Sequence, residues 1–318
     1  MKKCGVGYAS IFYGTGYGNG FPDESRAISE LTKNGMVNIY VEVSDVGSGG
    51  ISVMWQIAAE TLGISKEFVK VIYSNTELMK DSGTAAASRQ TYNTGNAVYD
   101  ATKKLKENMN LAYRCNKNLN LEITLDSDVK LKELYDIMDK NSISHKTEGY
   151  FKAETSKLDM ETGQGNPYWP YTFGAQRVTV QVDDETGKID VLEVIAVNDA
   201  GRIINPVSAE GQSEGGVAMG IGYALMEEIE LDKGTIKNKN FSDYIIPTSK
   251  DIPHIETHFI EEIEETGPYG AKGIGEPVMI PTAPAILNAI YDAVGVRMTS
   301  VPVTCDKLLL ALKKKNNR

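Results

Sequence analysis

Residues 267–277 read Gly-Pro-Tyr-Gly-Ala-Lys-Gly-Ile-Gly-Glu-Pro, and they are the most informative stretch of this 318-residue sequence. The stretch lacks the Gly-Lys-Ser/Thr tripeptide of a phosphate-binding P-loop. It places one carboxylate, Glu276, among glycines and directly before the run Pro-Val-Met-Ile-Pro at residues 277–281. A carboxylate in such dry, close-packed surroundings has a reason to act as a general base. A surface glutamate in a turn explains this stretch equally well when it is taken alone.

Two further glycine-rich segments lie upstream. Residues 14–20, Gly-Thr-Gly-Tyr-Gly-Asn-Gly, look like a dinucleotide loop, but such a loop must open a helix and the following Phe-Pro-Asp at 21–23 does not. A flexible loop is therefore favoured there. Residues 47–50, Gly-Ser-Gly-Gly, separate a predicted strand at 36–44 from a predicted helix at 52–62. Backbone N–H groups at that helix N-terminus can face an anion, although an ordinary tight turn fits the spacing as well.

Another segment, residues 82–91, consists of small and hydroxyl side chains with one arginine: Ser-Gly-Thr-Ala-Ala-Ala-Ser-Arg-Gln-Thr. Small side chains let a ligand approach the backbone closely, and Ser, Thr and Arg can bond phosphate. A flexible linker would have the same composition. Because a predicted helix at 97–110 follows and holds the segment in place, the pattern favours a ligand site.

The order of the expected helices and strands indicates an α+β fold with two lobes. The Asn-, Lys- and Asp-rich residues 114–146 contain the boundary, which gives a first lobe at 1–146 and a second lobe at 147–318 that carries Glu276. Gly63 is the expected C-cap of helix 52–62. The other expected elements are a strand at 68–73, hairpin strands at 176–182 and 189–197, and helices at 131–139, 215–228, 283–294 and 304–313.

The composition argues against several classes of function. The net charge is −10, and without a basic stripe the chain is poorly suited to bind nucleic acid or an anionic membrane. No apolar run approaches the ~18–20 residues that span a bilayer, and no signal-peptide core follows the N-terminus, so we expect a cytoplasmic protein. The scattered Cys4, Cys115 and Cys305 form no iron–sulfur motif, so redox electrons must leave through other chains.

The sequence His-Ile-Glu-Thr-His at residues 254–258 differs from the His-Glu-x-x-His helix of zinc proteases. Pro253 and the alternating pattern predict a strand. Two histidines on one strand face could bind zinc, but only His145 remains as a third histidine. Exposed histidines without a metal are the favoured interpretation.

Taken in order, these stretches resemble the second molybdopterin-binding domain of the xanthine dehydrogenase and aldehyde oxidoreductase family. Residues 270–276 resemble the family's active-site signature, and Asp-Val-Gly-Ser-Gly at 45–49 is similar to its Gly-Gln-Gly pterin loop. Ser48 stands where the family usually has Gln. The other segments similar to cofactor-contacting segments are 88–90, 94–97, 205–206 and 211–212.

The resemblance covers nearly the whole chain, but it starts where the family's large subunit is already about half complete. This arrangement resembles bacterial nicotinate dehydrogenase, whose molybdenum subunit is divided between a large and a medium chain, and this sequence is similar to the medium chain. The expected partners are a large molybdopterin subunit that supplies the other half of the site, a subunit with 2Fe-2S clusters and a subunit with FAD.

The same resemblance implies molybdenum with a sulfido or selenido ligand, bound through molybdopterin cytosine dinucleotide. No side chain would ligate the metal directly, and Ala87 would lie near it. Glu276 would be the catalytic base in hydroxylation of a small, nicotinate-like N-heteroaromatic substrate, with water as the oxygen source. Xanthine or another purine, an aldehyde, and a non-catalytic assembly role stay open as alternatives.

Two groups of residues are expected around this site. Tyr13 and Tyr17 could stack on or bond a heterocycle, or could serve only packing and loop anchoring. The residues expected to contact the cofactor are Gly47, Ser48, Gly49, Ala87, Ser88, Arg89, Gln90, Thr91, Gln212, Lys272, Gly273 and Gly275.

Overall fold

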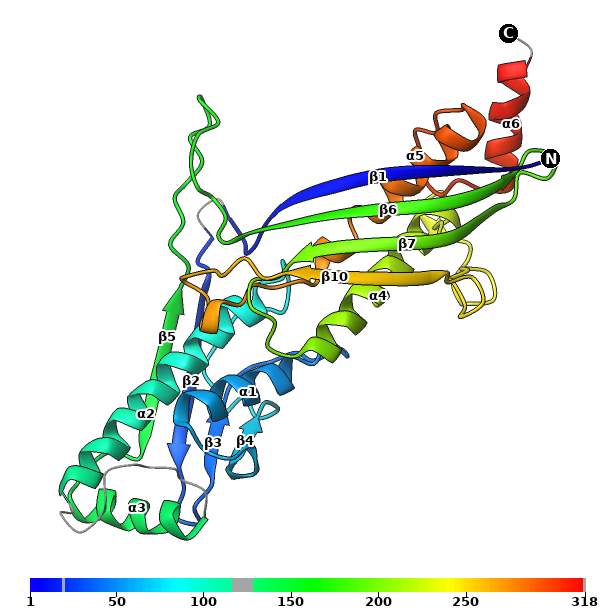
Figure 1. Ribbon diagram of the computed structural model, residues 1–318. Coiled ribbons are helices and arrows are strands. Elements are labelled where there is room, and N and C mark those ends of the chain that lie inside the picture. The colour runs from blue at the N-terminus through cyan, green and yellow to red at the C-terminus, as the bar shows by residue number, and fades with distance from the viewer. Residues whose placement is uncertain (19–20, 116–127, 317–318) are drawn as a thin grey trace.

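Two four-stranded sheets, each with helices packed against it, make up this computed structural model (Figure 1). The structure describes residues 1–18, 21–115 and 128–316. The first sheet has the order β4-β3-β2-β5 and the second has the order β1-β6-β7-β10. A separate two-stranded hairpin pairs β8 (Leu231–Asp232) with β9 (Thr235–Ile236). The mixed α+β class expected from the sequence is confirmed.

The first lobe is built on a sheet of short strands. Its elements are β2 (Glu24–Leu31), β3 (Val37–Tyr40), β4 (Val69–Ile72), β5 (Lys146–Lys152), α1 (Gly50–Leu62), α2 (Gly95–Cys115) and α3 (Asp128–Lys140). Side chains from both layers, such as Ile39 and Leu105, are fully buried between sheet and helices. Helix α2 lies close to β5 because Gly149 has no side chain: a Cβ there would be 2.1 Å from the Ala97 carbonyl oxygen.

The second lobe is built on longer strands. Its elements are β1 (Lys2–Gly14), β6 (Tyr171–Asp183), β7 (Ile189–Asp199), β10 (His254–Ile260), α4 (Pro206–Leu225), α5 (Thr282–Val294) and α6 (Cys305–Asn316). Val178, Val194 and Ile286 are fully buried where the sheet meets the helices. Helix α5 packs on β1 across Gly7, where a Cβ would be 2.1 Å from the Ala285 carbonyl oxygen.

The two sheets do not follow the order of the chain. β1 pairs antiparallel with β6, from Lys2 opposite Asp183 to Gly14 opposite Tyr171, and therefore belongs to the second lobe. β5 pairs with β2 and belongs to the first lobe. The lobes predicted as 1–146 and 147–318 thus differ from the sheets at residues 2–14 and 147–152, because strand pairing over so long a separation leaves no local signal.

Most of the other predicted elements match the structure. Gly63 ends α1 with a φ of 71°, as a C-cap in the left-handed region does. Helix α4 begins earlier than the expected residue 215, since Asn205 caps its first turn by accepting the Ser208 N–H. The strands β1 and β2 were not predicted. Within the polar boundary at 114–146, residues 116–127 lie outside the described residues. Among the described ranges, no helix has the length and apolar character needed to cross a membrane.

Candidate active site

Glu276 opens a single turn of 3-10 helix, Glu276–Val278, which packs against α4. The approach is close because α4 carries glycine where this turn passes: a Cβ on Gly216 would be 2.4 Å from a Val278 methyl carbon. The buried Gln176 fixes the turn from the sheet side. Its amide donates to the Val278 carbonyl at 2.7 Å and accepts from the Thr282 hydroxyl at 2.8 Å. The backbone below Glu276 is therefore held from two sides.

Ser88, from the small-residue segment of the first lobe, meets Glu276. The Ser88 hydroxyl accepts the Glu276 backbone N–H at 3.0 Å and also donates to the Glu276 carboxylate. The absence of a side chain at Gly273 permits this contact, since a Cβ there would be 1.7 Å from the Ser88 carbonyl oxygen. The structure thus brings together Ser88, Gly273 and Glu276, which the sequence had assigned to one site from separate motifs.

Tyr13, near the end of β1, lies beside the same carboxylate. Burial of the phenol, together with the negative charge of Glu276, raises the pKa of Tyr13 to about 12. Below that pH the phenol is protonated and can donate a hydrogen bond. Of the two predicted tyrosines, Tyr13 is therefore the one that the structure places next to Glu276.

Tyr17 has a different position. Its hydroxyl bonds the Thr84 hydroxyl and accepts the Thr84 backbone N–H at 3.1 Å. The guanidinium carbon of Arg89 lies 5.2 Å from the centre of its ring. Both the hydroxyl and one ring face of Tyr17 thus have partners within the chain, which favours the loop-anchoring interpretation over substrate contact.

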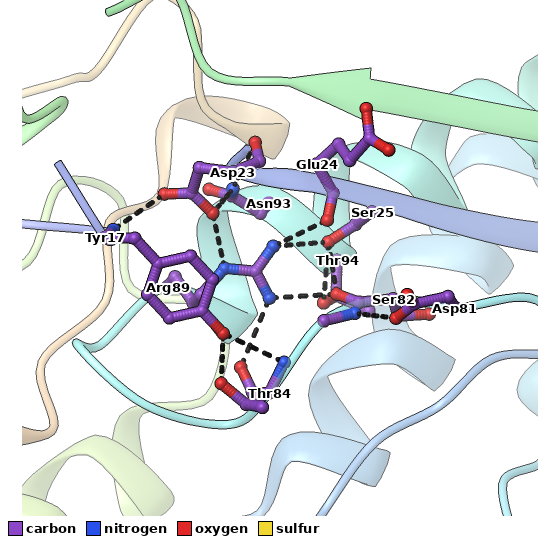
Figure 2. A network of polar contacts seen from close by, with 11 residues as sticks. Tyr17, Asp23, Glu24, Ser25, Asp81, Ser82, Thr84, Arg89, Asn93 and Thr94 are labelled. Atoms are coloured by element: carbon purple, nitrogen blue, oxygen red, sulfur yellow. Dashed lines mark hydrogen bonds and ion pairs between the residues drawn. The ribbon is translucent and has the colours of Figure 1, made fainter. Parts of the chain in front are cut away.

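Arg89 is the centre of a buried polar network (Figure 2). The side chain is 0% exposed. All five N–H groups of the guanidinium donate within the chain: Nε to Asp23 Oδ1 at 2.5 Å, Nη1 to the Ser82 and Thr84 carbonyls at 2.9 and 3.2 Å, and Nη2 to the Glu24 carbonyl and Ser25 hydroxyl at 2.8 and 2.9 Å. No guanidinium N–H is left to donate to a ligand, and contact of Arg89 with the cofactor stays a prediction.

The glycine loop before α1 also binds an internal group. Asp45 Oδ1 accepts the N–H groups of Gly47 and Gly49, each at 3.0 Å, and Oδ2 accepts the N–H of Ile51 at 3.2 Å. Although partial burial acts in the opposite direction, these bonds hold the pKa of Asp45 below its ordinary value. In this structure the anion that accepts these N–H groups is the chain's own carboxylate, and contact of Gly47 and Gly49 with a cofactor stays a prediction.

A small cavity lies beside this loop, between α1 and α4. Four residues predicted to contact the cofactor line it: Ser48, Thr91, Gln212 and Lys272. Asn205, Ser208 and Arg202 add polar groups to its wall. Neutral hydroxyls and amides with one arginine suit the pterin edge and phosphates of a molybdopterin nucleotide, so the residues present fit that group.

Lys272 and Gln90 have further contacts. The Lys272 ammonium is 2.7 Å from Asp199 Oδ2, and both side chains are buried, so this lysine serves chiefly as one member of an internal ion pair. Gln90 begins the helical turn Gln90–Thr94, and its side chain reaches the start of α1, where a Cβ on Gly50 would be 3.3 Å from its Oε1. Ala87 adjoins Ser88, and both have positive φ values, 53° and 54°. Gly275 is exposed and a Cβ there would be 3.2 Å from the Ser88 hydroxyl.

The histidine pair lies away from these residues. Residues 254–258 belong to β10, as predicted, and His258 is exposed and bonds Glu256 at 2.8 Å. In the described ranges, no group of three or more His, Cys, Asp or Glu side chains could hold a metal ion.

Sequence reasoning missed several residues that shape the site. Asp23 neutralises Arg89, and Gln176 supports the turn at Glu276. A buried arginine requires a carboxylate partner, but nothing local marks which of the 43 acidic residues it is. Asp45 had a signal, since an aspartate followed by glycines at the second and fourth positions is typical of a carboxylate that accepts nearby backbone N–H groups.

Comparison with known proteins agrees with this geometry. Residues 1–253 match the family model of the molybdopterin cofactor-binding domain. The chain belongs to this family. The xanthine dehydrogenase molybdenum-binding subunit of Escherichia coli O157:H7 is 33% identical over 294 residues, which cover 87% of this molybdopterin-binding chain and 38% of the relative. The aldehyde oxidoreductase of Megalodesulfovibrio gigas is 32% identical over 316 residues, covering 98% and 32% of the two chains.

This chain also shares its fold with solved structures of the family. The crystal structure of aldehyde oxidoreductase from Desulfovibrio desulfuricans superposes with a TM-score of 0.85 at 33% identity, over 98% of this chain and 32% of that one. The resemblance to the xanthine dehydrogenase and aldehyde oxidoreductase family is thereby confirmed. The chain spans less than half the length of these relatives.

Proposed function

We propose that this chain is the part of a molybdenum hydroxylase that carries the catalytic base, and that Glu276 is that base. The contact of Glu276 with Ser88, beside Tyr13, carries the proposal: the family's signature glutamate is placed by residues from both lobes. A storage or assembly subunit has no need of a carboxylate positioned in this way.

The cofactor we propose is molybdopterin cytosine dinucleotide, held by the cavity residues Ser48, Thr91, Gln212 and Arg202. When bound, the molybdenum centre supplies the two-electron oxidation that side chains cannot perform. Glu276 takes up the proton that water releases as it becomes the product oxygen. Tyr13, protonated below about pH 12, donates to the substrate or to Glu276.

For the substrate we propose a small N-heteroaromatic compound. A relative that is 30% identical over 320 residues, covering 96% of this chain and 39% of its own, is named 6-hydroxypseudooxynicotine dehydrogenase complex subunit gamma, from Paenarthrobacter nicotinovorans. Xanthine and aldehydes are the alternatives, since the relatives above are named for them. Tyr13 supports an aromatic substrate, because a phenol can both stack and donate a hydrogen bond.

We further propose that partner chains complete the enzyme: a large molybdopterin subunit, an iron–sulfur subunit and an FAD subunit. The relatives are more than twice as long as the matched region. The open face of the second sheet also supports a partner, because Tyr8, Phe12 and Phe173 are 64%, 64% and 52% exposed there and Phe12 stacks on Phe173 at 5.1 Å. A cytoplasmic location stays a prediction.

Co-expression with candidate partner chains tests the proposal. The purified complex should contain molybdenum and a cytosine dinucleotide, and it should oxidise at least one of nicotinate, xanthine and benzaldehyde with an artificial electron acceptor. Product formed in isotopically labelled water should carry the label. A complex that holds molybdenum but oxidises none of a broad set of heterocycles and aldehydes would favour the assembly role instead.

A further inference from the structure

The contact between Ser88 and Glu276 has a specific geometry. A single hydroxyl accepts the backbone N–H of Glu276 at 3.0 Å and donates its proton to the carboxylate of the same residue. The hydroxyl therefore fixes both the start of the turn and the orientation of the side chain. Ser88 engages one carboxylate oxygen, Oε2, of Glu276, and the phenol of Tyr13 lies beside the same carboxylate.

Ser88 is itself held in an uncommon backbone conformation. Ala87 and Ser88 have φ values of 53° and 54°, in the left-handed region that non-glycine residues seldom adopt. Such residues persist where the surroundings over-determine them. Here the Ala87 carbonyl accepts the Gly16 N–H at 3.0 Å, and the Ser88 carbonyl lies against Gly273.

The Arg89 network provides the anchor for this segment. Arg89 follows Ser88 directly, and its guanidinium bonds the carbonyls of Ser82 and Thr84 at the other end of the same loop (Figure 2). The ion pair with Asp23 and the bonds to Glu24 and Ser25 tie the loop to the first sheet. The buried Arg89 side chain therefore joins the two ends of the loop that presents Ser88, because it extends from one end and bonds the carbonyls at the other.

We propose that Ser88 is a positioning residue for the catalytic base, and that the buried Arg89 network exists to hold its hydroxyl on Glu276. The proposal rests on the proposed function of Glu276. It assigns the loop 82–89 a role in aiming the carboxylate, in place of the direct anchoring of the cofactor by Arg89 that the sequence had predicted. Ser88 does not take up the substrate proton, since its own proton is committed to Glu276.

The test uses the complete complex in three forms: Ser88→Ala, Ser88→Gly and the control Ser10→Ala. Ser10 is an exposed serine on β1, the strand that carries Tyr13. The alanine variant removes the hydroxyl at the same backbone conformation. The glycine variant removes it while relieving the left-handed strain, so a shared effect of the two variants reports the hydroxyl and not the backbone.

Both Ser88 variants should retain molybdenum. With whichever of nicotinate, xanthine or benzaldehyde is oxidised, kcat should fall about ten- to hundredfold while KM changes less than about threefold. Values of kcat and KM equal to those of Ser10→Ala would overturn the proposal.

A second readout does not depend on turnover. Crystal structures of the complexes should show the Glu276 carboxylate in one orientation in the parent and Ser10→Ala forms, and in a different or divided orientation in both Ser88 variants. An unmoved carboxylate in Ser88→Ala would refute the positioning role. If no substrate is oxidised, the function proposed for Glu276 fails, yet these structures still decide whether Ser88 orients it.

Discussion

Replacement of Arg89 by methionine should loosen the loop 82–94 severely. The side chain is fully buried, and Asp23, its partner at 2.5 Å, is 4% exposed. The substitution removes five hydrogen bonds and leaves a buried carboxylate without its counter-charge. Breaking a buried pair from one side costs about 3–5 kcal/mol, most of it from the uncompensated charge.

Hydrogen exchange of the assembled complex, read by mass spectrometry, is the suitable assay because it reports the opening of one segment without global unfolding. A loss of about 3–5 kcal/mol corresponds to a fall in protection of about two to four orders of magnitude across the loop. The double variant Arg89→Met with Asp23→Asn should recover part of this protection, since no unpaired charge is left.

Arg177→Met is the matched control. Its guanidinium is 2.8 Å from Glu193, but the two side chains are 36% and 40% exposed. A pair of this kind is worth about 0–1 kcal/mol, so the control should change protection less than about fivefold. If the loop were as well protected from hydrogen exchange in Arg89→Met as in Arg177→Met, the buried network would not be what holds the loop.

Three further outcomes follow from the same structure. Glu276→Gln should lower the pKa of Tyr13 from about 12, because it removes a nearby negative charge, and ultraviolet titration against Tyr13→Phe measures this. Gly273→Ala should abolish turnover, because its Cβ would overlap backbone at 1.7 Å, whereas Gly215→Ala on the open side of α4 should leave turnover and melting temperature close to the parent values. Phe12→Asp should reduce copurification of partner chains at least severalfold, because it places a charge on the exposed apolar face.

Much of the fold could be predicted because its signals are local. The hairpin of β6 and β7 joins alternating strands through a polar turn, and α5 has a clear apolar face. The strand β1 could not be predicted in the same way. Gly5 and Gly7 suggest a loop, yet they are needed where α5 crosses the sheet, and the partner strand lies far along the chain.

The site was predicted in part for a similar reason. Motif order assigned Glu276 and Ser88 to one site, and the two residues are in contact in the structure. An arginine among small residues suggests phosphate binding, whereas in the structure the Arg89 guanidinium bonds backbone carbonyls and Asp23, which only the folded chain brings together. The sequence shows which hydrogen-bond donors exist, but not which of them are already bonded to other groups of the folded chain.

The most direct test of the central claim is the turnover of Glu276→Gln in the assembled, molybdenum-loaded complex. The amide keeps the shape of the side chain and can still contact Ser88, but it cannot take up a proton. Loss of a positioned base typically costs about 10²–10⁴-fold in rate, so kcat should fall at least a hundredfold at unchanged molybdenum content. A kcat within a few-fold of the parent, with the metal fully retained, would contradict the assignment of Glu276 as the catalytic base.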